Sequence, residues 1–172
     1  MAVSIEDIKK LRAMTGAGLA DVKKALTEAE GDYEKAKELI RERGLAIAAK
    51  RSDRETSNGC VLVKQVDGFA AMVAIKCETD FVANGQDFIA LVQEILDAAV
   101  ANKCKSLDEV KALKLANGED AATAVQQRSG VTGEKMELDG YNFLEGENLY
   151  VYDHMNTEAC RQLKRKHNHV DL

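Results

Sequence analysis

The first fifty residues alternate between apolar positions at helical spacing and short glycine-containing breaks. Ile5, Ile8 and Leu11 recur three residues apart, and Ser4 with Asp7 has the spacing of a capping box at a helix start. Two further helical patterns follow, with apolar positions at Leu19, Val22, Ala25, Leu26 and Ala29, and then at Tyr33, Ala36, Leu39 and Ile40. Helices of about ten residues are unstable alone in water, so we expect the three to close on one another as a bundle over residues 1–50.

Glycines and one polar stretch mark the breaks between these patterns. Gly16 and Gly18 separate the first two helices, and the third pattern reaches Gly44, after which Leu45 to Lys50 can extend it. Residues 51–59 are polar, mixed in charge and without periodicity. This stretch is therefore predicted to be a linker and the main domain boundary.

The apolar period changes beyond the linker. Two β-rich runs, Cys60 to Val66 and Phe69 to Cys77, flank Asp67-Gly68, which is typical of a two-residue hairpin turn with positive φ. A long amphipathic helix follows, marked by Phe88, Leu91, Val92, Ile95, Leu96 and Ala99.

The remaining pattern mixes helices and strands. Ser106 and Glu109 have capping-box spacing ahead of a short helix over 107–113, and a further helix is predicted over 120–128. Residues 136–155 return to strand in two runs broken near Gly146. The fold class is therefore predicted to be α+β, with a core over 60–156 of antiparallel strands and helices on one face. The basic stretch 157–172 has no apolar face and is expected to be a disordered tail.

Composition narrows the class of partner. Hydrophobic residues make up 45% and charged residues 31% of the chain, which is typical of a globular protein. The formal net charge of −5 argues against nucleic acid as the main partner, because phosphate binding requires a basic surplus. No apolar run approaches the length of a membrane span, and the N-terminus has no apolar signal region. A cytoplasmic protein with a protein partner and no membrane contact is expected.

No catalytic motif or metal-binding spacing is recognisable. The glycine-rich run from Thr15 to Gly18 lacks the strand and lysine of a phosphate loop, so a tight turn between helices is favoured. Four scattered cysteines, at positions 60, 77, 104 and 160, are typical of buried thiols. His154, Cys160, His167 and His169 match no zinc-finger spacing. We therefore expect no enzyme activity, no cofactor and no metal.

The segment from Cys77 to Asn84 stands out because it places an aromatic residue between a strand and a helix. Thr79 or Asp80 can cap a turn there, which leaves Phe81 and Val82 at the tip of the connection, available to a partner. In the alternative interpretation, Phe81 folds under and staples the start of the helix to the sheet. Periodicity alone favours this second interpretation.

Two motifs give the chain a resemblance to a known family. The run LRAMTGAGLADVKKALTEAEGDYEKA (11–36) resembles the amino-terminal domain of elongation factor Ts, and CETDFVAN (77–84) resembles the most characteristic segment of that family. Residues 44–54 and 59–75 are similar to its linker and first hairpin, and LDAAVA (96–101) to the end of its next helix. The resemblance runs from the start of the chain to about Asn156.

The resemblance implies a fold, a function and a set of site residues. The fold would be a three-helix domain like ubiquitin-associated domains, followed by an α+β core. The function would be binding of elongation factor Tu and acceleration of its GDP release. Positions that match the contact with the nucleotide domain of the partner are Lys9, Arg12, Leu19 and Ala20. Positions that match the motif disturbing the partner's magnesium site are Thr79, Asp80, Phe81 and Val82, with Phe81 inserted beside that site.

The family also implies a longer protein. Its members continue into a second core subdomain and often a helical dimerisation hairpin, so this chain is expected to be a shortened member, and a homodimer is expected only where that region is present. Two rival functions stay open. One is a ubiquitin-associated-type protein-binding module without exchange activity, and the other is RNA binding through the basic tail.

Overall fold

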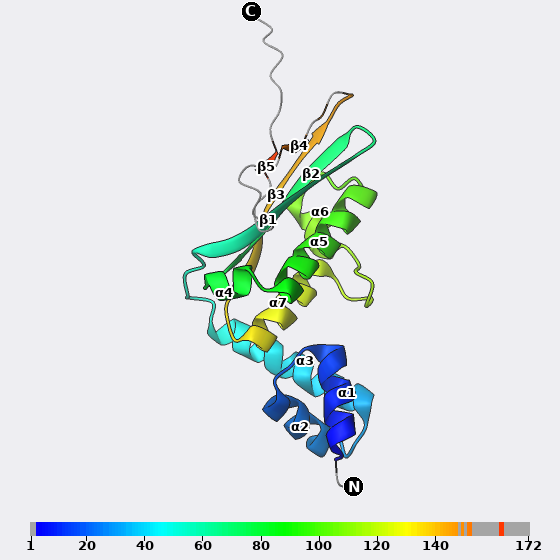
Figure 1. Ribbon diagram of the computed structural model, residues 1–172, viewed down its shortest axis with the longest axis vertical. Helices are drawn as coiled ribbons and strands as arrows, with labels where there is room; N and C mark the ends of the chain where they lie inside the picture. Colours follow the sequence, from blue (N-terminus) through cyan, green and yellow to red (C-terminus); the bar gives the residue numbers. More distant parts are fainter. Residues whose placement is uncertain (1–2, 148, 150, 153–161, 164–172) are drawn as a thin grey trace, which may run out of the picture. The chain divides into compact units, whose positions relative to one another are not determined.

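The protein has the predicted α+β class, in a computed structural model that describes residues 3–147, 149, 151–152 and 162–163 (Figure 1). The chain forms two compact units. The first comprises Met1–Arg54 with Gln126–Lys135, and the second comprises Glu55–Val125 with Met136–Leu172. The stretch 126–135 thus belongs with the N-terminal helices, a grouping that no local sequence signal indicated.

Three N-terminal helices, α1 (Ile5–Thr15), α2 (Leu19–Glu28) and α3 (Tyr33–Lys50), make up most of the first unit. The capping box of α1 is confirmed, because the Ser4 side chain accepts from the Asp7 amide while the Asp7 carboxylate accepts from the Ser4 amide. Asp32 caps α3 by accepting from the amides of residues 34 and 35. The buried core of the three helices consists of Ile8, Leu11, Ala17, Val22, Ala25, Leu26, Ala29 and Ala36.

Gly44 lies inside α3 and does not end it, so the helix includes the extension over 45–50. The reason is a close crossing with α7 (Ala121–Thr132), whose later part belongs to the same unit. A Cβ added to Gly44 would lie 3.5 Å from the Cα of Gly130. The missing side chains let the two backbones approach, and this contact offsets the low helix propensity of glycine.

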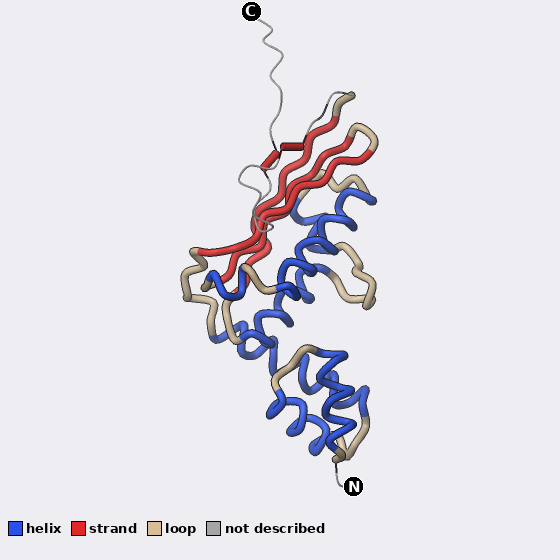
Figure 2. The backbone as a smooth tube through the Cα atoms, in the orientation of Figure 1, coloured by secondary structure: helices blue, strands red, loops and turns tan. Residues whose placement is uncertain are grey.

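The second unit is built on one antiparallel sheet of strand order β1-β2-β3 (Figure 2). The strands are β1 (Asn58–Val66), β2 (Phe69–Cys77) and β3 (Met136–Glu145). The predicted hairpin turn is confirmed, with φ of 46° at Asp67 and 74° at Gly68. β1 begins at Asn58, so the last two residues of the predicted linker are part of the sheet.

Helices α5 (Gln86–Ala101) and α6 (Leu107–Ala112) cover one face of this sheet, as Figure 1 shows. α5 packs on β1 and β2, and its buried residues Phe88, Leu91, Val92, Ile95, Leu96, Ala99 and Val100 join the core of the unit. The predicted capping box of α6 forms only in part. Ser106 accepts from the Glu109 amide, but the Glu109 carboxylate accepts from the amide of Lys105 and not from that of Ser106.

A short pair of strands, β4 (Val151–Tyr152) and β5 (Gln162–Leu163), completes the described elements. β5 comes from the segment that was expected to be a disordered tail. The other residues of 157–172 lie outside the described residues, as do His154, Cys160, His167 and His169. The three described cysteines, Cys60, Cys77 and Cys104, are buried thiols, which agrees with the prediction.

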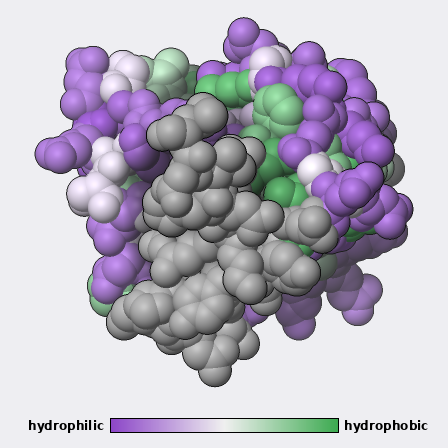
Figure 3. All heavy atoms as spheres, turned by 90° about the horizontal axis from the view of Figure 1, so that it is seen from above, coloured by the Kyte–Doolittle hydropathy of each residue, from purple (hydrophilic) through white to green (hydrophobic). Residues whose placement is uncertain are grey.

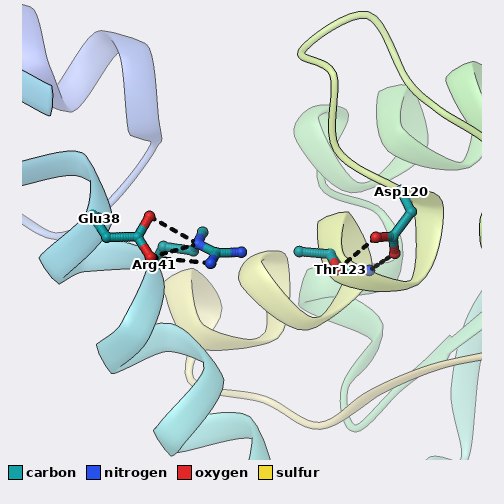
Figure 4. A network of polar contacts seen from close by, with 4 residues as sticks. All are labelled: Glu38, Arg41, Asp120 and Thr123. Atoms are coloured by element: carbon teal, nitrogen blue, oxygen red, sulfur yellow. Dashed lines mark hydrogen bonds and ion pairs between the residues drawn. The ribbon is translucent and has the colours of Figure 1, made fainter.

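Polar contacts support individual helices in each unit (Figure 4). On α3, Arg41 Nη2 lies 3.0 Å from Glu38 Oε1, three residues earlier. At the start of α7, the Asp120 carboxylate accepts from the Thr123 amide at 2.8 Å and from its hydroxyl at 3.1 Å. These two hydrogen bonds cap the helix.

The described residues form a largely hydrophilic surface in the view of Figure 3, with a smaller hydrophobic area. None of the described helices has the length and apolar character needed to cross a membrane.

Candidate functional site

A single helical turn, α4 (Asp80–Ala83), connects β2 to α5 and contains the motif that the sequence singled out. Thr79 is its N-cap, with extended backbone (φ −121°, ψ 157°) and a hydroxyl that accepts from the Val82 amide at 3.4 Å. Asp80 occupies the first position of the turn and is exposed. A carboxylate at this position is favoured by the partial positive charge of the free amides.

Phe81 is 87% exposed, the highest value among the exposed large apolar residues that the structure describes. The alternative in which Phe81 staples the helix start to the sheet is therefore wrong. Val82, by contrast, is half-buried and packs against the core, and Ala83 is buried. Only Phe81 stands at the tip, because successive residues of a helical turn point about 100° apart.

Side-chain hydrogen bonds hold the backbone on both sides of Phe81. The Asn58 amide Nδ2 donates to the Glu78 carbonyl at 2.9 Å, and the Cys77 thiol donates to the Thr79 carbonyl at 3.2 Å. On the other side, Asn84 Nδ2 donates to the Asp80 carbonyl at 2.9 Å. Sequence reasoning missed Asn58, since it lies twenty residues before Glu78 and in a stretch that was expected to be linker.

Gly59 brings the start of β1 close to the end of β2. A Cβ added to Gly59 would lie 2.5 Å from the Ile75 carbonyl oxygen and 3.0 Å from Lys76 Cα. No side chain fits there without a shift of the backbone. The one available signal was a glycine immediately before a predicted strand, because glycine can mark a close backbone approach.

The predicted partner-contact residues of the first unit are all exposed. Lys9 and Arg12 are three residues apart on α1 and therefore lie on one face of that helix. Leu19 and Ala20 open α2, and Leu19 is 56% exposed although its spacing had suggested a place on the apolar face. Leu19 is the first residue of the helix, and Val22, three residues later, takes the buried position instead.

The sequence did not indicate two further residues of the first unit. Met14, near the end of α1, is an exposed large apolar residue. Arg128 of α7 lies near Gly16, in the turn between α1 and α2: a Cβ added to Gly16 would be 3.5 Å from Nη1 of Arg128. Gly16 itself adopts φ 68° and closes α1 by donating its amide to the Arg12 carbonyl. We call the predicted contact residues Lys9, Arg12, Leu19 and Ala20, together with Arg128, the helical surface. Met14 lies about 200° from Arg12 around α1 and is not part of it.

Shifted pKa values occur at groups with structural contacts. The pKa of Asp7 is lowered by hydrogen bonds from the Ser4 side chain and from Tyr33, whose hydroxyl donates to Asp7 Oδ1 at 2.5 Å. Burial raises the pKa of Tyr141 to about 12, and its hydroxyl donates to the Cys104 carbonyl at 2.6 Å. Within the described ranges, no group of three or more His, Cys, Asp or Glu side chains is placed to hold a metal ion.

Comparisons with known proteins match this chain to one family. The family model described as Elongation factor TS matches residues 78–169. Proteins named Elongation factor Ts are 63% identical over 156 residues in Bacteroides fragilis and 58% over 171 residues in Bacteroides thetaiotaomicron. A third, from Porphyromonas gingivalis, is 54% identical over 154 residues.

The matches cover nearly all of this chain but only part of each relative. They include 91%, 99% and 90% of this chain, and 47%, 52% and 56% of the respective relatives. The chain thus spans about half the length of the curated relatives it matches. The family match and the Bacteroides thetaiotaomicron alignment both extend beyond Asn156, where the sequence motifs placed the end of the resemblance.

Proposed function

The chain belongs to the elongation factor Ts family, and we propose that it binds elongation factor Tu in the cytoplasm and accelerates the release of GDP. The observation that carries this proposal is the position of Phe81, which is 87% exposed on a turn held by capping and side-chain hydrogen bonds. Exposing a large aromatic residue to water is unfavourable, so a site of this kind is expected to serve a partner that buries it.

Phe81 is proposed to act as a wedge at the nucleotide site of the partner. A GTPase holds its nucleotide through backbone amides around the phosphates and a magnesium ion bound by side-chain oxygens. Displacing the elements that carry these ligands weakens the electrostatic hold on GDP. Asp80, adjacent and exposed, would place a carboxylate beside the magnesium shell, while Thr79 and Val82 hold the turn.

The energy for this displacement comes from binding. Burying a Phe side chain contributes about 1.5–3 kcal/mol, and the helical surface of the first unit would add further contacts. Coupling between two ligands of one protein is reciprocal, so a factor that weakens GDP binding is itself weakened by GDP to the same extent. Exchange of this kind needs no covalent step in the factor.

The helical surface is proposed to hold the nucleotide domain of elongation factor Tu. It combines the exposed apolar side chain of Leu19 with the cationic groups of Lys9, Arg12 and Arg128. Apolar anchors and arginines are the side chains that most often dominate protein–protein binding energies. A binding module without exchange activity would use this surface alone, and it would leave the exposure of Phe81 without a function.

The direct test is release of a fluorescent GDP analogue from purified elongation factor Tu, with and without this chain. The proposal predicts faster release that saturates with the concentration of the chain. Stable binding without acceleration would favour the binding-module alternative. Strong salt-dependent binding to RNA, with no effect on elongation factor Tu, would instead favour the RNA-binding alternative.

A further inference from the structure

We propose that Asn58 is a positioning residue that fixes the turn presenting Phe81. The inference deepens the proposed exchange function and rests on it for the consequence at the partner. Its structural part, that Asn58 restrains Phe81, concerns this chain alone. The two parts can therefore be tested separately.

Asn58 lies where the β1–β2 ladder ends. The last pair in the register is Asn58 with Cys77, and Glu78 is the first residue beyond it. Just beyond this pair, the Asn58 side chain donates from Nδ2 to the Glu78 carbonyl at 2.9 Å. A side-chain amide therefore ties the chain leading into α4 to the start of β1.

The neighbouring residue makes this contact possible. Gly59 pairs with Lys76, and a Cβ at Gly59 would stand 2.5 Å from the Ile75 carbonyl oxygen. The close approach of the two backbones brings the short Asn58 side chain within reach of Glu78. Asn58 and Gly59 therefore act together, although both precede the motif by about twenty residues.

The restraint matters because α4 is only one turn long. A helix of four residues has little stability of its own, so its direction depends on how its two ends are held. At the start of α4, the Asn58 side chain donates to the Glu78 carbonyl and the Cys77 thiol donates to the Thr79 carbonyl. At its end, the Asn84 side chain donates to the Asp80 carbonyl. Phe81 lies between these points with almost no packing of its own. A preformed orientation lowers the entropy cost when a partner binds.

The chain allows a direct measurement of this restraint, because it contains no tryptophan. In a Phe81→Trp background the new indole is the only one in the protein, and its fluorescence anisotropy reports motion at the tip. We expect Asn58→Ala and Asn58→Asp to lower that anisotropy. The aspartate keeps the size of asparagine, but its carboxylate cannot donate to Glu78. Asn142→Asp, at an exposed position of β3, makes the same charge change and should have no effect.

The second measurement uses the native Phe81 and fluorescent GDP release from elongation factor Tu. Loss of one hydrogen bond predicts that Asn58→Asp lowers the maximal release rate on the order of 3- to 10-fold. The thermal midpoint of the chain should stay close to that of Asn142→Asp, which separates positioning from general destabilisation. If Asn58→Asp fails to fold, Asn58→Ala, which adds no charge, decides the question.

The outcomes are distinguishable. Unchanged anisotropy in a folded Asn58 variant overturns the positioning role, whatever the exchange assay gives. Lower anisotropy with an unchanged maximal release rate overturns its consequence at the partner. If the unaltered chain releases no GDP, the proposed function fails, while the anisotropy experiment still decides whether Asn58 restrains Phe81.

Discussion

Gly130 of α7 lies so close to Gly44 of α3 that a Cβ added to Gly130 would stand 2.1 Å from the Cα of Gly44. The reverse addition is less severe, since a Cβ on Gly44 would lie 3.5 Å from the Cα of Gly130. The contact is therefore asymmetric. It requires glycine at 130, whereas at 44 it leaves room for a methyl group.

This asymmetry predicts opposite effects of two equivalent substitutions. Gly130→Ala should destabilise the protein by about 1–3 kcal/mol, because the added methyl group meets backbone that cannot move easily. Gly44→Ala should be neutral or stabilise by up to about 1 kcal/mol, since alanine favours the helix. Urea unfolding followed by circular dichroism measures both. Equal destabilisation by the two variants would show that the crossing differs from the one described.

The contact between Asp7 and Tyr33 predicts acid sensitivity of the first unit. Hydrogen bonds from Ser4 and Tyr33 lower the pKa of Asp7 in the folded state. Its contribution is therefore complete above the unfolded value of about 4 and is lost as the pH falls through the lower folded value. The thermal midpoint should fall between about pH 5 and pH 2, and Asp7→Asn should reduce this dependence. If the thermal midpoint of Asp7→Asn depends on pH as that of the parent chain does, Asp7 is not the cause. Asp21→Asn, at an exposed position, is the control and should keep the acid dependence of the parent chain.

Leu19 is predicted to contribute to binding rather than to folding. Its side chain is largely exposed at the start of α2, while Val22 is fully buried. Leu19→Ala should leave the thermal midpoint unchanged and weaken binding to elongation factor Tu by about 1–2 kcal/mol, or about 5- to 30-fold in Kd. Isothermal titration with nucleotide-free partner measures the effect. The matched control is Ile5→Ala, because Ile5 is likewise an exposed apolar residue, at the start of α1. An equal loss of affinity in both variants would refute a specific role for Leu19.

Thr79 is predicted to support exchange through its cap. Its hydroxyl accepts from the Val82 amide at the start of α4. Removing such a cap destabilises the start of the helix by about 0.5–2 kcal/mol, so Thr79→Ala should slow GDP release several-fold. Thr79→Ser keeps the hydroxyl and should support GDP release at nearly the original rate. Stopped-flow release assays compare the two. Equal rates for both variants would mean that the cap does not influence Phe81.

Features set by neighbouring residues could be predicted from the sequence. The Asp67-Gly68 turn needs positive φ at both positions, and the pair Ser4 and Asp7 forms a capping box, so each was readable from a few adjacent residues. The exposure of Phe81 was harder to predict. A cap at Thr79 or Asp80 allowed the tip position, but periodicity favoured a buried one, and the resemblance to a family motif was needed to decide between them.

Features that depend on distant contacts could not be predicted. Gly44 looked like a helix end because its partner, Gly130, comes from a helix 86 positions later. The contact of Asn58 with Glu78 required the exact register of the hairpin, in which a slip of one residue moves every side chain to the other face. Leu19 and Ile5 fitted apolar stripes, yet both lie near the start of their helices and are exposed.

The central claim is that Phe81 drives GDP release, and a comparison of Phe81→Ala with the unaltered chain tests it most directly. Release of fluorescent GDP from elongation factor Tu is measured at saturating factor, with Val66→Ala as a control at another exposed apolar position. Loss of the aromatic side chain that the partner is proposed to bury should slow GDP release about 10- to 100-fold. The thermal midpoint should stay unchanged because Phe81 contributes little to the core. Release as fast with Phe81→Ala as with the unaltered chain would contradict the account.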